Sequence, residues 1–441
     1  MQWPRPRLPY LQRRHRALLS ARLWLRHMLF WGGAVGVGLA ATAFALSSDR
    51  AQALFRHVVA ASPWLPLLVT PLTLAAVAAL TRRYFKGAEG SGIPQTIAAI
   101  RMPEGAGRDA VLSLRVAMAK MLLTCVGLAG GASVGREGPT VQVGAALLYN
   151  LRWLARFPRH LLERGLIIAG GGAGVAAAFN TPLAGIVFAI EEMARSFEER
   201  SSGTLLTAVI IAGLAAVYVQ GDYTYFGATA ATLGGASGWL GVLLCGLAGG
   251  LLGGGFSRLL LAFSARGLPG RAGVLQRTYP VRFAAACGLL LALIGLASGS
   301  AVYGSGYDEA RHLLEGTGEA SAAYGLWKML ATLVSFVSGI PGGLFAPSLS
   351  AGAGVGHAVA SLVAQDGGAL VVIGMAAYFA GVVQAPITAF VIVTEMTDNH
   401  DMVVPLMLAT LLATAVSRLV CPKPLYKALA NNYLARVRPP A

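Results

Sequence analysis

Two segments rich in glycine and proline have the composition of helix starts that could bind an anion. The first reads GREGP over residues 135–139 and the second reads GGLFAP over residues 342–347, and each directly precedes an apolar run. A proline near the start suits the first turn of a helix, because no backbone N–H is needed there. The unpaired N–H groups and the positive end of the helix dipole then attract an anion without a full positive charge. Such partial charges hold a halide loosely enough to release it, which suits transport.

Glu137 lies inside the first of these segments. A carboxylate at this point competes with a bound anion for the same amide groups, and protonation removes that competition. An ionisable side chain within a membrane is by default a functional candidate. The sequence therefore predicts that Glu137 couples proton binding to anion entry. The alternative is a buried ion pair with Arg136, although adjacent residues on a helix do not face each other.

The composition of the chain is typical of a helical membrane protein. Of its 441 residues, 56% are hydrophobic and 12% are charged, against roughly 25% charged residues in a soluble domain. So few charges cannot solvate a soluble protein of this size, which excludes an ordinary soluble globular protein. The apolar runs are continuous rather than alternating, and this favours membrane helices over a β-barrel.

The net charge of +16 is explained by orientation in a membrane, and we expect no nucleic-acid partner. Residues 1–27 hold seven arginines and no acid, directly before the apolar run 28–48, so the positive-inside rule puts them in the cytoplasm. The length of this segment and its lack of a clean cleavage site favour a retained helix over a signal peptide. Basic residues also follow the apolar run 64–80 and occur near the C-terminus. The sequence thus predicts a multi-pass protein with both termini cytoplasmic.

The four cysteines show no paired spacing of the kind that binds a metal, so we expect neither a metal site nor a cofactor. They lie in or beside apolar segments. Cysteine in such a position behaves as a small hydrophobic residue.

The two halves of the chain repeat each other. With an offset of 208 residues, nine identities fall in the 25 positions from Lys120 to Gly144. With an offset of 204, the segment 170–191 matches the segment 374–395 at six positions. Gly90-Ser91-Gly92 has a weaker counterpart at residues 304–306. Secondary transporters are often built from such repeats, with the binding site where matching hydrophobic segments are interrupted. The predicted units are a basic N-terminal helix (1–27), two membrane repeats (28–220 and 221–420), and a C-terminal helix and tail (421–441).

Four short motifs together resemble the CLC family of chloride channels and proton/chloride exchangers. They are GSGIP at residues 90–94, GREGP at 135–139, GLFAP at 343–347 and a late tyrosine, Tyr426. The resemblance covers nearly the whole chain. It implies an all-α integral membrane fold of about 18 tilted and broken helices in two inverted-topology repeats. It also implies a homodimer in a bacterial inner membrane, with a pore for chloride in each subunit and coupling to protons.

The resemblance further implies roles for individual residues. Glu137 is similar to the external gating glutamate, and Glu192 to the inner glutamate that passes protons in exchangers. The hydroxyl groups of Ser91 and Tyr426 match groups that coordinate the central anion, together with backbone N–H groups of Leu344 and Phe345. The supporting positions are Gly90, Gly92, Pro94, Lys120, Gly135, Arg136, Gly138, Pro139, Gly343 and Pro347.

Several of these residues have a plainer interpretation when taken alone. Ser91 can be a helix N-cap, and Tyr426 can be an aromatic anchor at the membrane interface. Lys120 and its counterpart Lys328 can extend to an interface instead of facing a pore. Serine at position 91 resembles the chloride-preferring members of the family rather than relatives that prefer nitrate or export fluoride.

The pair Glu191-Glu192 bears on whether the chain is an exchanger or a passive channel. Channels of the family usually carry an apolar residue at the position of Glu192, so a glutamate there favours exchange. The pair can also be a solvated edge of a cytoplasmic helix. Glu191 recurs as Glu395 in the second half, which suggests a structural role, whereas Met396 stands opposite Glu192. We therefore expect a proton-coupled chloride antiporter and not an enzyme, with a voltage- or pH-gated chloride channel as the alternative.

An intramembrane serine protease is a remote alternative from another class of protein. Residues 235–238 read GASG and residues 131–135 read GASVG, and both resemble nucleophile motifs. The first lies in a connecting loop, and the second lacks the strand-turn-helix context that gives the motif its meaning. A protease also leaves the internal repeat unexplained.

Overall fold

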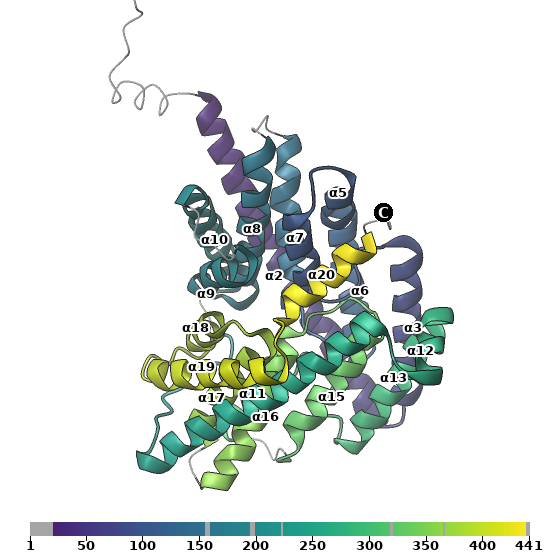
Figure 1. Ribbon diagram of the computed structural model, residues 1–441, viewed down its shortest axis with the longest axis vertical. Helices are drawn as coiled ribbons and strands as arrows, with labels where there is room; N and C mark the ends of the chain where they lie inside the picture. Colours follow the sequence, from purple (N-terminus) through teal and green to yellow (C-terminus); the bar gives the residue numbers. More distant parts are fainter. Residues whose placement is uncertain are drawn as a thin grey trace, which may run out of the picture.

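The chain folds into a bundle of helices, many of them short or interrupted (Figure 1). The computed structural model describes residues 21–154, 159–194, 199–221, 224–317, 321–364 and 367–437. Within these ranges the only β-type pairs are isolated bridges, and no strand is present. The all-α fold class is thereby confirmed. Most of the predicted N-terminal helix 1–27 and the basic residue Arg438 lie outside the described residues.

The helices of the first half run from α2 to α10. They are α2 (Ala21–Ala61), α3 (Pro66–Tyr84), α4 (Ile93–Arg101), α5 (Ala106–Leu112), α6 (Leu114–Ala129), α7 (Glu137–Asn150), α8 (Arg159–Phe179), α9 (Pro182–Phe188) and α10 (Glu199–Gln220). A short 3-10 turn (Leu151–Trp153) follows α7, and a π-helical segment (Ala189–Ala194) extends α9.

The helices of the second half run from α11 to α20. They are α11 (Gly235–Arg266), α12 (Gly270–Thr278), α13 (Pro280–Ala297), α14 (Tyr307–Glu315), α15 (Tyr324–Val337), α16 (Phe345–Val363), α17 (Gly367–Val383), α18 (Pro386–Thr397), α19 (Val403–Val420) and α20 (Leu425–Val437).

Five segments within the described ranges are long and apolar enough to cross a membrane, which supports a multi-pass protein. They are His27–Ala61, Ala106–Ala129, Gly235–Ala265, Pro280–Ala297 and Val403–Val420. Large apolar side chains such as Leu68, Leu122 and Leu214 are more than half exposed. A soluble protein rarely leaves so much apolar surface uncovered, whereas lipid covers it readily.

The helices of the two halves correspond one to one over most of their length. Adding 214 to the first residues of α2, α3 and α4 gives those of α11, α13 and α14, and adding 204 to those of α9 and α10 gives those of α18 and α19. The first residues of α7 and α16 differ by 208, the offset found in the sequence. The internal repeat is therefore a repeat of structure as well.

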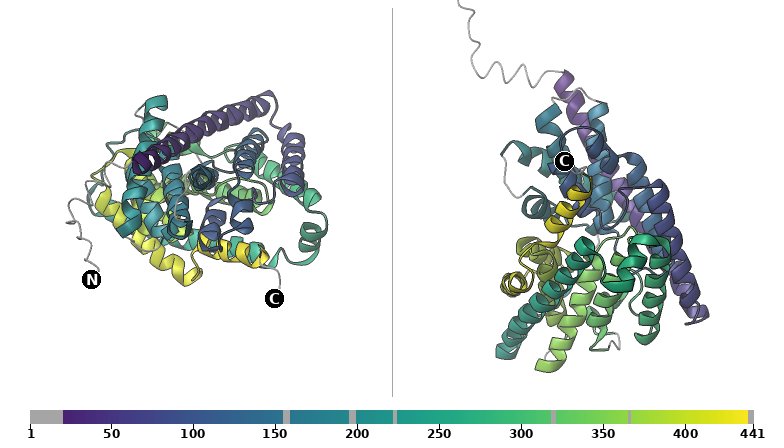
Figure 2. Two further views of the ribbon diagram at one scale, coloured as in Figure 1. Left: turned by 90° about the horizontal axis from the view of Figure 1, so that it is seen from above. Right: turned by 45° about the vertical axis from the view of Figure 1, so that its right-hand side comes forward.

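The two repeats are inverted relative to each other. Gly135 and its counterpart Gly343 form an antiparallel bridge in which each N–H donates to the carbonyl of the other, at 2.8 and 2.7 Å. Helices α7 and α16 begin beside this bridge and run away from it in opposite directions, α7 in the upper and α16 in the lower half of Figure 1. Figure 2 shows α2 running along the outside of the bundle.

Glycine allows equivalent helix pairs to approach closely in both repeats. Gly144 of α7 lies against the carbonyl group of Gly170 of α8, and their counterparts Gly352 and Gly374 lie together in the same way in α16 and α17. A Cβ atom at any of these positions collides with the neighbouring backbone. Small residues serve this purpose at membrane helix interfaces, so part of the high glycine content belongs to helix packing.

Candidate functional site

The N-termini of α7 and α16 meet near the centre of the molecule. Their first residues, Glu137 and Phe345, follow directly on the loops joined by the bridge of Gly135 and Gly343. Both helices carry a proline in the first turn, Pro139 or Pro347, which leaves the starting geometry intact. The positive ends of two helix dipoles thus point towards one region, which favours an anion there.

The loop before α4 brings Ser91 to the same place. Ser91 is 1% exposed, and its hydroxyl oxygen lies against Gly138 in the first turn of α7. Gly92 has φ of 101° and faces the carbonyl oxygen of Gly138, so both the backbone conformation and the space require glycine. Pro94 lies in the first turn of α4. The loop, including Gly90, is therefore shaped to present Ser91 to the start of α7.

Tyr426 reaches the site from α20, near the end of the chain. Its side chain is fully buried, and its hydroxyl lies beside that of Ser91. Within the part of the chain described here, neither hydroxyl makes a hydrogen bond of normal geometry to another protein group. Buried hydroxyl groups rarely stay unsatisfied in proteins, and two of them side by side suit a ligand that accepts hydrogen bonds. Tyr426 is therefore no interfacial anchor.

Leu344 and Phe345, which the sequence assigned to the anion site, lie at the start of α16. Leu344 is the N-cap residue of α16 and Phe345 its first residue, and both are 1% exposed. The ring of Phe345 packs on Phe179 and Phe379, at centroid distances of 4.9 and 4.1 Å. These contacts hold the start of α16 rigidly, so its backbone N–H groups are fixed in direction.

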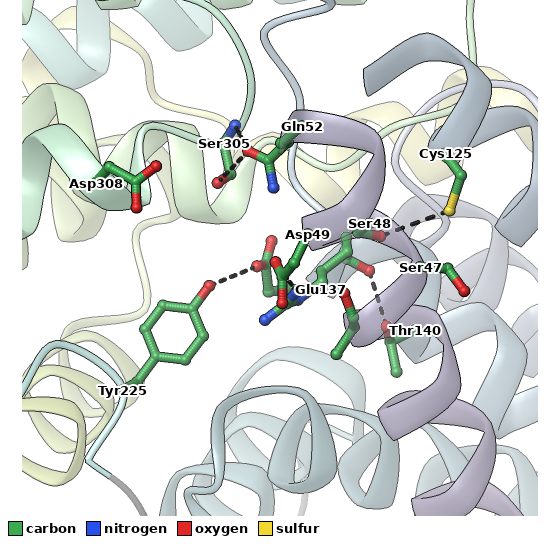
Figure 3. Close-up of polar contacts among 12 residues, drawn as sticks. Ser47, Ser48, Asp49, Gln52, Cys125, Glu137, Thr140, Tyr225, Ser305 and Asp308 are labelled. Carbon is green, nitrogen blue, oxygen red and sulfur yellow. Dashed lines mark hydrogen bonds and ion pairs between the residues drawn. The ribbon is translucent and has the colours of Figure 1, made fainter. Parts of the chain in front are cut away.

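Glu137 lies across the gap between the two helix starts. Its side chain is 1% exposed, and its carboxylate lies beside the backbone N–H of Ala346 in α16. The hydroxyl of Tyr225 donates a hydrogen bond to it at 3.3 Å (Figure 3). The carboxylate thus occupies the place where the dipole of α16 favours negative charge.

Arg136 turns away from this gap towards α2. Its guanidinium donates to the carbonyl oxygen of Ala45 at 2.9 Å and forms an ion pair with Asp49 at 2.5 Å. The ion pair of Arg136 is thus made with Asp49 of α2. The alternative considered from the sequence, a buried ion pair between Arg136 and Glu137, is not formed.

Lys120 and Lys328 lie in the protein interior and bind the loops before α4 and α14. Both side chains are fully buried. Lys120 donates to the carbonyl oxygens of Glu89 and Gly90 at 3.2 and 2.9 Å, and Lys328 donates to those of Val302 and Gly304 at 2.9 Å each. The alternative that these lysines extend to a membrane interface is wrong, because the carbonyls of an unwound loop hold them in the interior.

Glu191 and Glu192, neighbours in the π-helical segment, have side chains in different surroundings. The carboxylate of Glu191 accepts hydrogen bonds from the N–H groups of Ile387 and Thr388, at 3.3 and 2.7 Å, at the start of α18. Glu192, the next residue, is 3% exposed and lies within electrostatic range of Tyr426. A solvated helix edge is therefore excluded for Glu192.

Glu395 repeats the contact of Glu191 in reverse. Its carboxylate accepts from the N–H groups of Leu183 and Ala184, at 3.1 and 2.6 Å, at the start of α9. Each repeat thus caps a helix start of the other. This exchange gives Glu191 the structural role that the repeat suggested.

A cavity of about 600 Å³ leads to the loop before α4. Its lining includes Arg82, Lys86, Ser91, Gln95 and Tyr433. A smaller cavity of about 260 Å³ lies at the counterpart loop before α14 and is lined by Gln52, Arg56 and Glu309 among others. Only the larger one contains a serine that the sequence assigned to the anion site.

Three residues near the site had no signal that sequence reasoning used. Tyr225 lies in the segment between α10 and α11, and Asp49 and Gln52 lie on α2. Each contacts a residue at least 87 positions away in the chain. One pattern could have pointed to Tyr225. It follows shortly after the last helix of the first repeat, as Tyr426 follows the last helix of the second.

Nothing in the described ranges supports a serine protease. The hydroxyl of Ser133 is hydrogen-bonded to that of Thr332 at 3.1 Å, and Ser237 lies in the first turn of α11. Those ranges also contain no group of three or more His, Cys, Asp or Glu side chains that could bind a metal ion.

The fold and the paired helix starts define a helical membrane transport protein of the inverted-repeat type. The family model described as voltage gated chloride channel matches residues 73–418, and the chain belongs to this family, the CLC family.

Solved structures share the fold at low sequence identity. A slow cyanobacterial Cl−/H+ antiporter matches with a TM-score of 0.78 and 23% identity, covering 93% of this chain and 98% of that one. A CLC-type fluoride/proton antiporter matches with 0.78 and 21%, covering 92% and 99%. A eukaryotic CLC transporter matches with 0.74 and 22%, covering 93% and 75%. These similarities establish the architecture in which the residues above lie.

Proposed function

We propose that the protein exchanges chloride for protons, with one pore in each subunit. The observation that carries this proposal is the position of Glu137, whose carboxylate lies beside the N–H of Ala346 between two helix starts. As an anion, it competes with chloride for the dipole of α16. When protonated, it loses this attraction and leaves the place open. Each opening of the anion path then takes up a proton.

Ser91, Tyr426, Leu344 and Phe345 provide the donors for chloride in this proposal. Two hydroxyl groups and two backbone N–H groups neutralise a halide through partial charges alone. Binding is then weak enough for release, which fast transport requires. The supporting glycines and prolines keep the loops open and the helix starts in place.

Glu192 supplies the inner end of the proton path. It is buried, it comes from a different helical segment than Glu137, and Tyr426 lies within electrostatic range of both carboxylates. While Glu191 serves as a cap for α18, its neighbour Glu192 brings an acid into the interior, and such an acid suits proton transfer.

The two tasks are tested separately in liposomes with an outward chloride gradient. We expect the wild-type protein to drive protons uphill, Glu192→Gln to move chloride with weakened proton coupling, and Glu137→Ala to move chloride without coupling. Glu315→Gln, at an exposed i,i+4 pair with Arg311, is the control. Chloride movement that never drives protons in the wild type makes the protein a passive channel and overturns the exchanger.

We further propose that the protein is a homodimer in a bacterial inner membrane with both termini cytoplasmic. The basic pair Arg82 and Arg83 at the end of α3 supports this orientation. The equivalent residues Leu183 and Ile387, 54% and 50% exposed, supply an apolar face at the starts of α9 and α18. Replacing both by Trp is expected to shift the protein to monomers in detergent, as measured by light scattering. An unchanged dimer excludes this face.

A further inference from the structure

The segment that connects the two repeats is fixed against α18. The N–H groups of Phe226 and Thr229 donate to the carbonyl oxygens of Met396 and Thr397, each at 3.0 Å. The side chain of Asn399 donates to the carbonyl oxygen of Ala231 at 2.9 Å. The connection is therefore held in place directly after Tyr225, and it positions side chains as a helix does.

Tyr225 is held by ring contacts on three sides. Its ring centroid lies 5.3 Å from that of Phe179, 5.0 Å from that of Phe226 and 5.1 Å from that of Tyr307, all edge to face. The residue is 3% exposed. Edge-to-face packing is directional, so these neighbours fix the direction of the hydroxyl. That direction is towards Glu137, at 3.3 Å (Figure 3).

Tyr225 and Tyr426 occupy similar positions after the last helix of each repeat. Helix α10, which ends the first repeat, stops at Gln220, and Tyr225 follows shortly after. Helix α19, which ends the second repeat, stops at Val420, and Tyr426 follows shortly after. Each repeat is thus followed by a buried tyrosine whose hydroxyl reaches the central site, Tyr426 at Ser91 and Tyr225 at Glu137.

We propose that Tyr225 is a positioning residue that latches Glu137 in its charged, pore-blocking position. This inference rests on the proposed function of Glu137 as the gate. A phenol donates a stronger hydrogen bond to a carboxylate than to a neutral carboxyl group. The latch therefore favours the blocked state, and proton uptake by Glu137 weakens it.

Other groups around Glu137 also favour its charged form, and all of them are kept when only the hydroxyl of Tyr225 is removed. Arg136, beside it in the chain, is paired with Asp49 of α2, and its positive charge also attracts the Glu137 carboxylate. Tyr426 of α20 lies on the side of Ser91. From α16 the backbone N–H of Ala346 lies beside the carboxylate.

Tyr225→Phe tests the latch because it removes the hydroxyl and keeps the ring. With less stabilisation of the charged gate, Glu137 takes up its proton at higher pH. We expect the half-activation pH of chloride flux in liposomes to rise by about half a unit to one unit. Tyr307→Phe is the matched control, since it removes a phenol hydroxyl from the same aromatic cluster, one that bonds Arg311.

The same pair of variants is then made with Glu137→Gln. We expect Tyr225→Phe to leave the chloride flux unchanged there, because the gate no longer ionises. An unshifted pH profile in Tyr225→Phe, equal shifts in both tyrosine variants, or a change of flux that persists with Glu137→Gln overturns the latch. Failure of the gate itself is recognised separately, since the wild-type protein then shows no proton-coupled flux.

Discussion

The loops before α4 and α14 are equivalent in the two repeats, yet their serines differ in what they contact. Each loop has the sequence Gly-Ser-Gly, and a buried lysine binds the carbonyls of each. Ser91 presents its hydroxyl to the start of α7. Ser305 donates both its N–H and its hydroxyl to the side-chain oxygen of Gln52, at 2.8 and 2.9 Å (Figure 3). One loop is open to a ligand and the other is closed by the protein itself.

The two loops also differ in the side chains that α2 and α11 place beside them. Adding 214 to Gln52 gives Arg266, the last residue of α11, whereas α2 continues to Ala61. Gln52 and Arg56 of α2 line the cavity of about 260 Å³ at the second loop. At the first loop, Leu260, Phe263 and Ser264 of α11 help to line a cavity of about 600 Å³. The side chain of Gln52, whose counterpart in α11 is an arginine, thus distinguishes the surroundings of two loops that are otherwise equivalent.

Of all these variants, those that remove either lysine are expected to lower the free energy of unfolding the most. Lys120→Met and Lys328→Met each leave buried loop carbonyls without a donor, at a cost of about 3 kcal/mol in the free energy of unfolding. We expect both variants to melt earlier in detergent, but only Lys120→Met to lose chloride affinity as well. Equal chloride binding in the two variants contradicts the assignment of the anion path to the first loop.

Gly138→Ala is expected to damage the open loop directly. A Cβ at Gly138 lies 2.8 Å from the carbonyl oxygen of Ser91, so the loop has to move. We expect the dissociation constant for chloride, measured by calorimetry, to rise about thirtyfold, or about 2 kcal/mol. Ala346→Gly at the counterpart position in α16 is the control and retains affinity within a few-fold. Wild-type affinity in Gly138→Ala shows that Ser91 can shift without loss.

Gln52→Ala is expected to open the second loop. It removes the acceptor of two hydrogen bonds from Ser305, which costs about 1.5 kcal/mol in the free energy of unfolding. Chloride affinity at the first loop stays the same. Arg56→Ala at the same cavity is the control, because it removes only an exposed ion pair with Asp308 and costs less than about 1 kcal/mol. A drop in chloride affinity in Gln52→Ala contradicts the separation of the two loops.

The smallest effect is expected from the serines themselves. Ser91→Ala removes one donor to chloride and lowers affinity about fivefold, or about 1 kcal/mol. Ser305→Ala leaves chloride affinity unchanged, because its hydroxyl is already used by Gln52. Titration calorimetry of both variants measures the difference. Equal losses place an anion at both loops.

The local features of the site were predictable from the sequence. Proline and glycine marked the starts of α7 and α16, and the offset of 208 residues paired them correctly. The all-helical membrane fold followed from long apolar runs with few charges. These features depend on neighbours in the chain, and a single sequence records such neighbours.

The contacts that distinguish the two loops were not predictable. Gln52 and Ser305 are 253 residues apart, and Glu137 and Tyr225 are 88 apart. Neither pair lies in matching positions of the repeat, so the internal symmetry gave no sign of them. The sequence left two alternatives open for the lysines, because their acceptors are carbonyls of unwound loops, which appear only in three dimensions.

The exchange of carboxylates between α9 and α18 has a consequence for the order of folding. The start of α9 is capped by Glu395, and the start of α18 by Glu191. A nascent chain that has inserted only its first repeat still lacks the acceptor for α9, which lies 211 residues further along the chain. The start of α9 is therefore capped only after α18 has been made and has packed against the first half.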